Sequence, residues 1–162
     1  MALDTSVGTE TSEAYCDVAY ADAYFDARNN ATWAALTVSD KEAALRLGCD
    51  YMEANYALLW CGEKTSETQA LSWPRTGTSV ASDVIPVQVQ RANAELAVRS
   101  SASGGNLQTD QGAAVKEETV GPITVIYQDG AKQVTKYSAV DNMLQSSGLM
   151  CRGFNQIAVV RA

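Results

Sequence analysis

Residues 39–59 read SDKEAALRLGCDYMEANYALL, and this stretch predicts the central helix of the fold. Ser39 and Glu42 have the spacing of a capping box, which favours a helix start at this point. Behind them two adjacent apolar rows recur at helical spacing, so the helix is predicted to bury a broad face. One row is Ala44, Leu47, Tyr51, Ala54 and Leu58, and the other is Leu45, Cys49, Met52, Tyr56 and Leu59.

Further helices are predicted on both sides of this stretch. Residues 17–28 place Val18, Ala21 and Phe25 on one helical face behind Asp17, a suitable N-cap. After the central helix, Pro86 suits a first helical position, and an apolar row follows it up to Gly104. Residues 1–13 are small and polar, and we expect them to be mobile or ordered by a partner.

Residues 62–77, GEKTSETQALSWPRTG, lie between these helices. Ser66 and Gln69 again have capping-box spacing, which predicts a short helix. That helix must end at Trp73, because the residue before a proline is disfavoured in helical conformation. Gly62, Lys64 and Thr65 supply only half of a phosphate-binding loop, so capping and turn roles are the favoured interpretation.

The predicted fold is mainly α: a small four-to-five-helix bundle with an inserted β-hairpin and an extended C-terminal arm. A single domain is expected over residues 1–162, because the length suits one core. Within it we place the bundle at residues 15–104, the hairpin at 113–128, a short helix at 137–148 and the arm at 149–162.

Charge and composition limit the function. The chain has 46% hydrophobic and 19% charged residues and a net charge of −7. Residues 1–81 hold 12 acids and 5 bases, whereas residues 82–162 hold 7 of each, so the acidity is N-terminal. A phosphate-binding surface needs clustered Lys and Arg, and the sequence shows no dense cluster of them.

Catalytic and metal chemistry are not expected. The chain has no His, so the side chain that most often activates Ser or Cys and the commonest metal ligand are both missing. Cys16, Cys49, Cys61 and Cys151 lack zinc-site spacing, and we expect reduced, mostly buried thiols. We predict no enzyme activity, cofactor or metal, and no membrane-spanning segment.

Trp73-Pro74-Arg75 allows two interpretations. An aromatic side chain beside a cation can stack the bases of single-stranded nucleic acid. Alternatively, Trp73 belongs to the core and Arg75 pairs with one of the many N-terminal carboxylates. The second interpretation is favoured, because a single platform beside an acidic half is a poor track for a nucleic acid strand.

Several motifs in order resemble the head-to-tail connector proteins of tailed bacteriophages, also called adaptor or head-completion proteins. The series runs from YCDVAYADAYFDAR through KEAALRLGCDYME, GEKTSETQALSWPRTG and IPVQVQRANAELA to VGPITVIYQDG, and it spans roughly residues 15 to 145. Val87-Gln88 departs from the acids expected after Ile85-Pro86. The structural motif that carries the resemblance includes Gln69, Trp73, Pro74, Arg75 and Pro86.

This resemblance implies a virion protein of the phage neck, made in the host cytoplasm. Its expected partners are the portal protein, a tail or tail-completion protein, and copies of itself in a ring, commonly a dodecamer. DNA would pass through the ring without specific binding. Some relatives are described as DnaT-like, so a single-stranded-DNA-binding replication accessory protein is the alternative, although the net charge of −7 argues against it.

The C-terminal arm is the expected partner-binding segment. It is apolar and basic, and by resemblance to connectors that reach the portal with this segment, it docks on the portal or an adjacent subunit. Folding back on its own bundle as an edge strand is the alternative. The residues expected to make the contact are Arg152, Phe154, Ile157, Val159, Val160 and Arg161.

Overall fold

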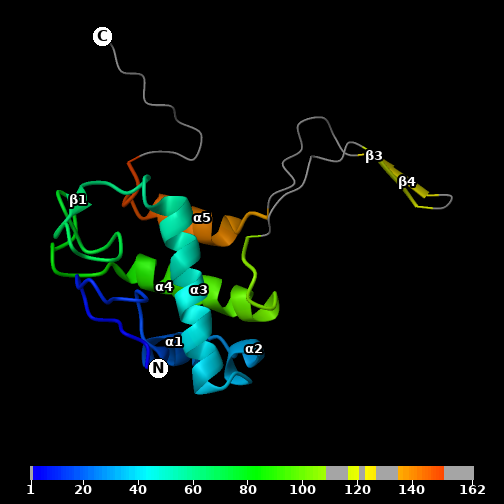
Figure 1. Cartoon of the computed structure of the whole chain (residues 1–162), viewed down its shortest axis with the longest axis horizontal. Coiled ribbons are helices and arrows are strands. Elements are labelled where there is room, and N and C mark those ends of the chain that lie inside the picture. Colours follow the sequence, from blue (N-terminus) through cyan, green and yellow to red (C-terminus); the bar gives the residue numbers. More distant parts are fainter. Residues whose placement is uncertain (1, 109–116, 121–122, 127–134, 152–162) are drawn as a thin grey trace, which may run out of the picture.

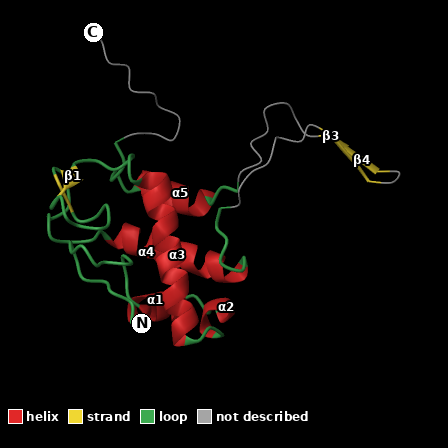
Figure 2. Cartoon of the chain, viewed as in Figure 1, coloured by secondary structure: helices red, strands yellow, loops and turns green. Residues whose placement is uncertain are grey.

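The computed structural model describes residues 2–108, 117–120, 123–126 and 135–151. It is mainly helical with a small antiparallel hairpin, as predicted (Figures 1 and 2). The helices are α1 (Val18–Asp26), α2 (Ala31–Ala34), α3 (Val38–Tyr56), α4 (Val87–Ala102) and α5 (Ser138–Ser146). The strands are β1 (Glu63–Lys64), β2 (Arg75–Thr76), β3 (Glu117–Val120) and β4 (Ile123–Ile126).

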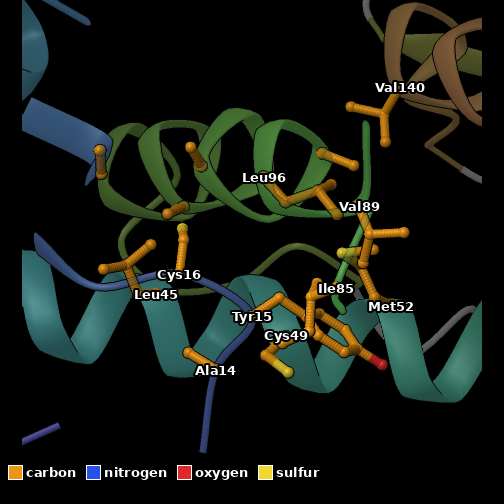
Figure 3. Packing of buried hydrophobic residues seen from close by; sticks show 14 of the residues in the cluster. Ala14, Tyr15, Cys16, Leu45, Cys49, Met52, Ile85, Val89, Leu96 and Val140 are labelled. Carbon is orange, nitrogen blue, oxygen red and sulfur yellow. The ribbon is translucent and has the colours of Figure 1, made fainter. Parts of the chain in front are cut away.

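The packing of α3 on α4 is the centre of the fold. Figure 3 shows residues 14–16 running beside this helix pair, with Tyr15 and Cys16 among the core side chains. Asn93 on α4 is fully buried, and its carboxamide joins all three segments. Its Nδ2 donates to the Leu45 carbonyl on α3 at 2.9 Å, and its Oδ1 accepts from the Tyr15 amide at 2.9 Å. A buried polar side chain with these partners fixes the position of the N-terminal segment on the helix pair.

Two helix starts differ slightly from the prediction. The N-cap of α3 is Thr37, whose side chain accepts from the Asp40 amide, so the helix begins before the predicted capping box at Ser39. Pro86 is itself the N-cap residue of α4, and Val87 is the first helical residue. Asp17 caps α1 as expected, accepting from the Tyr20 amide at 2.7 Å.

The short helix predicted from Ser66 to Trp73 does not form. The Gln69 carboxamide explains why: its Oε1 accepts from the Ser66 amide, and its Nε2 donates to the carbonyls of Leu71 and Pro74. The bond from the Ser66 amide is the one a capping box makes, but the two Nε2 bonds hold the following residues in a turn instead of a helix. The segment is therefore a compact turn with a cis Trp73–Pro74 peptide bond, closed at its base by the β1–β2 pair.

One of the two apolar rows predicted on α3 is largely buried, but the other is partly exposed. Leu47 is 38% exposed and Leu58 is 81% exposed, and Ala54 in the same row is exposed as well. The prediction that both rows are buried was therefore wrong for the described part of the chain.

The prediction that residues 1–13 are mobile or ordered by a partner was wrong for residues 2–13, which pack on the fold of their own chain. The Glu13 amide donates to the Asp4 carbonyl at 2.8 Å, and the Glu13 carboxylate pairs with Arg46 on α3 at 2.8 Å. Farther along, the Ala70 amide donates to the Thr9 carbonyl at 3.0 Å. These contacts order a segment whose small polar side chains gave no sign of it.

The prediction of four reduced thiols was also wrong in part. Cys16 and Cys49 are free and buried, but Cys61 and Cys151 form a disulfide. A short antiparallel pairing brings these two together: the Cys61 amide donates to the Leu149 carbonyl and the Cys151 amide to the Leu59 carbonyl. The arm predicted from residue 149 therefore begins no earlier than residue 152, because residues 149–151 belong to the folded body.

β3 and β4 form the hairpin predicted within residues 113–128. Glu117 pairs with Ile126 and Val120 with Ile123. These strands make their main contacts with each other and not with the helices, and Figure 1 shows them outside the bundle. The rest of the predicted hairpin lies outside the described residues. The short helix predicted at residues 137–148 is α5, whose Val140 and Leu144 are buried.

Candidate functional site

Trp73-Pro74-Arg75 forms a structural joint, the place where the N-terminal segment, α3 and the β1–β2 loop meet. Trp73 is 1% exposed and packs edge-on against Trp60, with ring centroids 5.7 Å apart. It therefore has no free face on which a nucleic acid base could stack. Pro74 is buried as well and faces Gly8 of the N-terminal segment. Of the two interpretations of Trp73, the core role is confirmed.

Arg75 corrects the second half of that interpretation, because it donates to backbone carbonyls and not to an N-terminal carboxylate. Nε donates to the Cys61 carbonyl at 2.7 Å, Nη2 to the Gly62 carbonyl at 2.5 Å and Nη1 to the Ser72 carbonyl at 3.1 Å. Burial lowers the pKa of Arg75. Three of its five N–H donors bind carbonyls of two chain segments and the side chain is buried, so the guanidinium is poorly placed to bind a phosphate.

Three residues that sequence reasoning missed complete the joint. The Tyr15 hydroxyl donates to the Glu53 carboxylate, and the Ser72 hydroxyl donates to the same carboxylate at 2.7 Å. The Ser72 amide also donates to the Tyr15 hydroxyl oxygen at 3.1 Å. Burial, and secondarily the charge of Glu53, raises the pKa of Tyr15 well above its usual value. In the sequence, Glu53 alone pointed to this network. It follows the buried Cys49 by four residues and therefore lies on the same side of α3.

Most cations of the described residues are held by partners within the fold. Lys41 pairs with Asp22 at 2.8 Å, Arg46 with Glu13 at 2.8 Å and Arg99 with Glu95 at 2.5 Å. Lys64 donates to the carbonyls of Gln69 and Ala70. Arg28 donates to the Tyr24 carbonyl at 2.7 Å and lies over the Tyr24 ring, with 3.6 Å from Cζ to the centroid. These contacts leave no dense basic track on the described part of the chain.

The described residues contain no group of three or more His, Cys, Asp and Glu side chains that could hold a metal ion. Within the same part of the chain, no helix has both the length and the apolar character needed to cross a bilayer. The two free thiols are buried, and burial raises the pKa of Cys16 to about 12 and raises that of Cys49 as well. A buried, protonated thiol is a poor nucleophile.

The structure brings together the predicted motif residues Gln69, Trp73, Pro74 and Arg75, while Pro86 lies at the start of α4. Trp73 and Arg75 are occupied by core and backbone contacts, whereas Gln69 and Pro74 line a hollow of about 280 Å³ together with Gly8, Thr65 and Asp83. The predicted partner-binding residues lie outside the described residues. They are Arg152, Phe154, Ile157, Val159, Val160 and Arg161.

Comparison with known proteins gives one match. The model of a family described as "Putative DnaT-like ssDNA binding protein" matches residues 1–162. No curated protein and no solved structure matches the chain. Because the match spans all of the sequence, the chain belongs to this DnaT-like family.

Proposed function

We propose that this chain is a structural subunit of a connector ring that joins the DNA-filled head of a tailed bacteriophage to its tail. The observation that carries the proposal is that the aromatic and cationic side chains of the Trp-Pro-Arg segment make their contacts inside the fold. Trp73 and Arg75, the side chains best suited to gripping a strand, form the joint between the N-terminal segment, α3 and the β1–β2 loop. A channel wall must let DNA pass, and an acidic chain whose described cations are mostly held by partners within the fold is suited to that.

The β3–β4 hairpin supports a role in assembly. A two-stranded sheet is marginal in water unless another surface covers it. The hairpin is inserted between α4 and α5, and its strands are paired with each other and not with the bundle. In a ring, the neighbouring subunit can cover such a hairpin and stabilise it. Contacts of this kind join two different surfaces, head to tail, and repeat by rotation until the ring closes.

The partners follow from this role. The subunit would contact its own copies in a ring, which we take to be dodecameric, the portal protein on the head side, and a tail or tail-completion protein below. DNA would pass without specific binding, and the protein would reside in the virion neck after synthesis in the host cytoplasm. The segment from Arg152 to Arg161 would dock on the portal or an adjacent subunit. No enzymatic step is part of this role.

The family description favours a second candidate, binding of single-stranded DNA. Lysines and arginines that no described contact holds, or that lie outside the described residues, would have to carry it. Lys136 is exposed, and Lys116, Lys132, Arg152 and Arg161 also follow residue 104. A DNA-binding surface would therefore belong to the C-terminal third of the chain, where acids and bases are more nearly balanced than in the N-terminal half.

Fluorescence anisotropy with a labelled single-stranded oligonucleotide separates the two candidates. The connector role predicts no binding at physiological ionic strength of about 0.15 M, and only weak binding at low salt. Binding that persists at physiological salt and is lost in a Lys132→Gln, Lys136→Gln variant would favour the DnaT-like function. An Arg75→Gln variant is not a suitable probe, because Arg75 supports the fold.

A further inference from the structure

The disulfide differs from the two free cysteines in its exposure to solvent. Cys151 is exposed and Cys61 is half-buried, whereas the free thiols Cys16 and Cys49 are 3% and 1% exposed. Thiol–disulfide exchange requires an attacking thiolate to reach one of the two sulfur atoms. A small reductant in solution can therefore attack the Cys61–Cys151 bond, while the two buried thiols stay out of its reach.

The bond joins two short segments that are paired by little else. One segment leads from α3 to β1 and the other follows α5, and the two lie side by side (Figure 1). The Cys61 amide donates to the Leu149 carbonyl at 2.9 Å, and the Cys151 amide donates to the Leu59 carbonyl at 3.0 Å. Even a complete two-stranded hairpin is marginal in water. A pairing with two backbone hydrogen bonds therefore depends on the disulfide to stay closed.

The first segment, residues 59–61, is fixed independently of the bond. Trp60 is 5% exposed and packs edge-on against Trp73. Arg75 donates to the carbonyl of Cys61 and to that of the next residue. These contacts belong to the structural joint, and none of them involves the second segment. We therefore expect residues 59–61 to keep their position when the disulfide opens.

The second segment, residues 149–151, has fewer attachments. Leu149 is buried, but Met150 is only partly buried and Cys151 is exposed. The preceding helix α5 is anchored on the bundle by its own buried side chains. Loss of the disulfide would therefore free Met150 and Cys151 from the first segment and leave α5 in place.

We propose that Cys61 and Cys151 form a redox latch. When oxidised, the latch holds Met150 and Cys151 on residues 59–61, and when reduced it releases them. Exposed disulfides are more easily reduced than buried ones, and they are more often regulatory. Disulfides of cytosolic proteins are likewise usually redox-sensing or catalytic.

Opening the latch consumes two thiol groups of a low-molecular-weight reductant. The thiolate of the first attacks Sγ of Cys151, the more exposed residue of the pair. The S–S bond breaks, and its electron pair leaves on Sγ of Cys61, which takes a proton from water. The second thiolate then attacks the sulfur of the first thiol in the mixed disulfide, and Sγ of Cys151 leaves and is protonated. Two reductant thiols have become one disulfide, and a low-molecular-weight disulfide closes the latch by the reverse steps.

The state of the latch follows the compartment. Cytosolic thiols keep accessible cysteines reduced, so the latch is open there, and an oxidising medium closes it. This inference does not require the connector role. Under that role, the attachment point of the C-terminal arm, Cys151, would be free during assembly in the host and fixed in the released particle.

Amide hydrogen exchange of the full chain, resolved by NMR, tests the latch. The protein is compared with and without dithiothreitol, which supplies both thiols. On reduction the Cys61 and Cys151 amides, whose acceptors lie across the latch, should exchange at least about tenfold faster than before and than the core amides of α4. The comparison with α4 separates local opening from a loss of overall stability. The Leu59 amide is a matched control: it donates to the Tyr56 carbonyl at 2.9 Å, on the fixed side, and should change no more than the α4 amides do.

Cys61→Ser combined with Cys151→Ser provides the matched variant, because its latch cannot close. The amides at residues 61 and 151 of this variant should exchange fast with and without dithiothreitol. Alkylation of the folded, reduced natural chain gives a second measurement. Cys61 and Cys151 should react with iodoacetamide at least about tenfold faster than the buried Cys16 and Cys49.

Three results would overturn the proposal. If the Cys61 and Cys151 amides stay as slow as the α4 amides after reduction, residues 149–151 are held without the bond. If these amides are already fast in the oxidised chain, the bond does not close the pairing. If dithiothreitol reduces the disulfide only in urea, the bond is a structural brace that a reductant cannot reach. None of these results would affect the DNA-binding test of the connector role.

Discussion

Gly48 on α3 lies against the backbone of Asn93 on α4, so closely that a Cβ at residue 48 would be 2.9 Å from the Asn93 carbonyl oxygen and 3.0 Å from the Ala97 amide nitrogen. Both obstructing atoms belong to helix backbone and cannot move aside as a flexible side chain would. The two central helices approach each other this closely because residue 48 has no side chain.

Gly48→Ala should therefore destabilise the protein by about 1–3 kcal/mol, because the added methyl group overpacks the helix crossing. In a helix without a close neighbour, the same change would stabilise by about 0.5–1 kcal/mol. The free energy of unfolding in urea distinguishes the two by sign. An increase in stability would show that α3 and α4 do not approach in this way.

Trp73→Ala should lower the free energy of unfolding by about 3–5 kcal/mol, because it removes a large, fully buried side chain that packs on Trp60. Any residual affinity for single-stranded DNA should be unchanged under conditions where the variant is folded. An unaltered unfolding midpoint together with lost DNA binding would instead assign Trp73 to a stacking surface.

Reduction of the Cys61–Cys151 disulfide should destabilise the chain by about 3–5 kcal/mol, because the bond closes a loop of sequence separation 90 in the unfolded state. The matched comparison is Cys151→Ser, whose stability should be equal with and without reductant. The free thiols Cys16 and Cys49 provide an internal reference, since a reductant does not alter them. Equal stability of the reduced and oxidised natural chain would mean that the bond makes no net contribution.

Stability should fall as the pH rises above about 9. Burial raises the pKa of Cys16 to about 12 and also raises the pKa values of Cys49, Tyr15 and Tyr56. In the unfolded chain the thiols ionise near pH 8.5 and the tyrosines near pH 10, so above these values the unfolded state binds fewer protons than the folded state. The loss approaches about 1.4 kcal/mol per pH unit for each group.

Urea midpoints at neutral pH and at several alkaline values measure this effect. Cys49→Ala should make the decline shallower, since it removes one of the groups that are kept neutral by burial. A midpoint that stays constant through pH 10, or an identical slope in the variant, would show that these side chains are not shielded from water in the folded state.

Helical periodicity predicted α1, α3 and α4 because their buried faces repeat at the spacing that the core requires, as Ala21 and Phe25 show on α1. It failed at residues 66–73, where local bonds from the Gln69 carboxamide to the Leu71 and Pro74 carbonyls hold a turn in place of the helix that capping-box spacing favoured. The Cys61–Cys151 bond could not be predicted, because the spacing of the cysteines carries no information on the pairing of residues 59–61 with 149–151.

The structural joint was only partly predictable. Trp73 could be assigned to the core, because a single aromatic platform beside an acidic half is a poor track for a nucleic acid strand. The partners of Arg75 could not be predicted, because every residue has a backbone carbonyl and the sequence does not mark which ones accept. The Tyr15–Glu53–Ser72 network depends on three segments that meet only in the folded chain. Function was the least accessible, since the sequence contains no catalytic or metal-binding pattern from which chemistry could be argued.

Electron microscopy of the purified protein mixed with the portal protein encoded by the same genome tests the central claim most directly. The account predicts an added closed ring on one face of the portal, and its loss when residues 152–162 are deleted from a chain that still folds. Portals without added density, combined with single-stranded DNA binding at physiological salt, would contradict the connector role and establish the DnaT-like one.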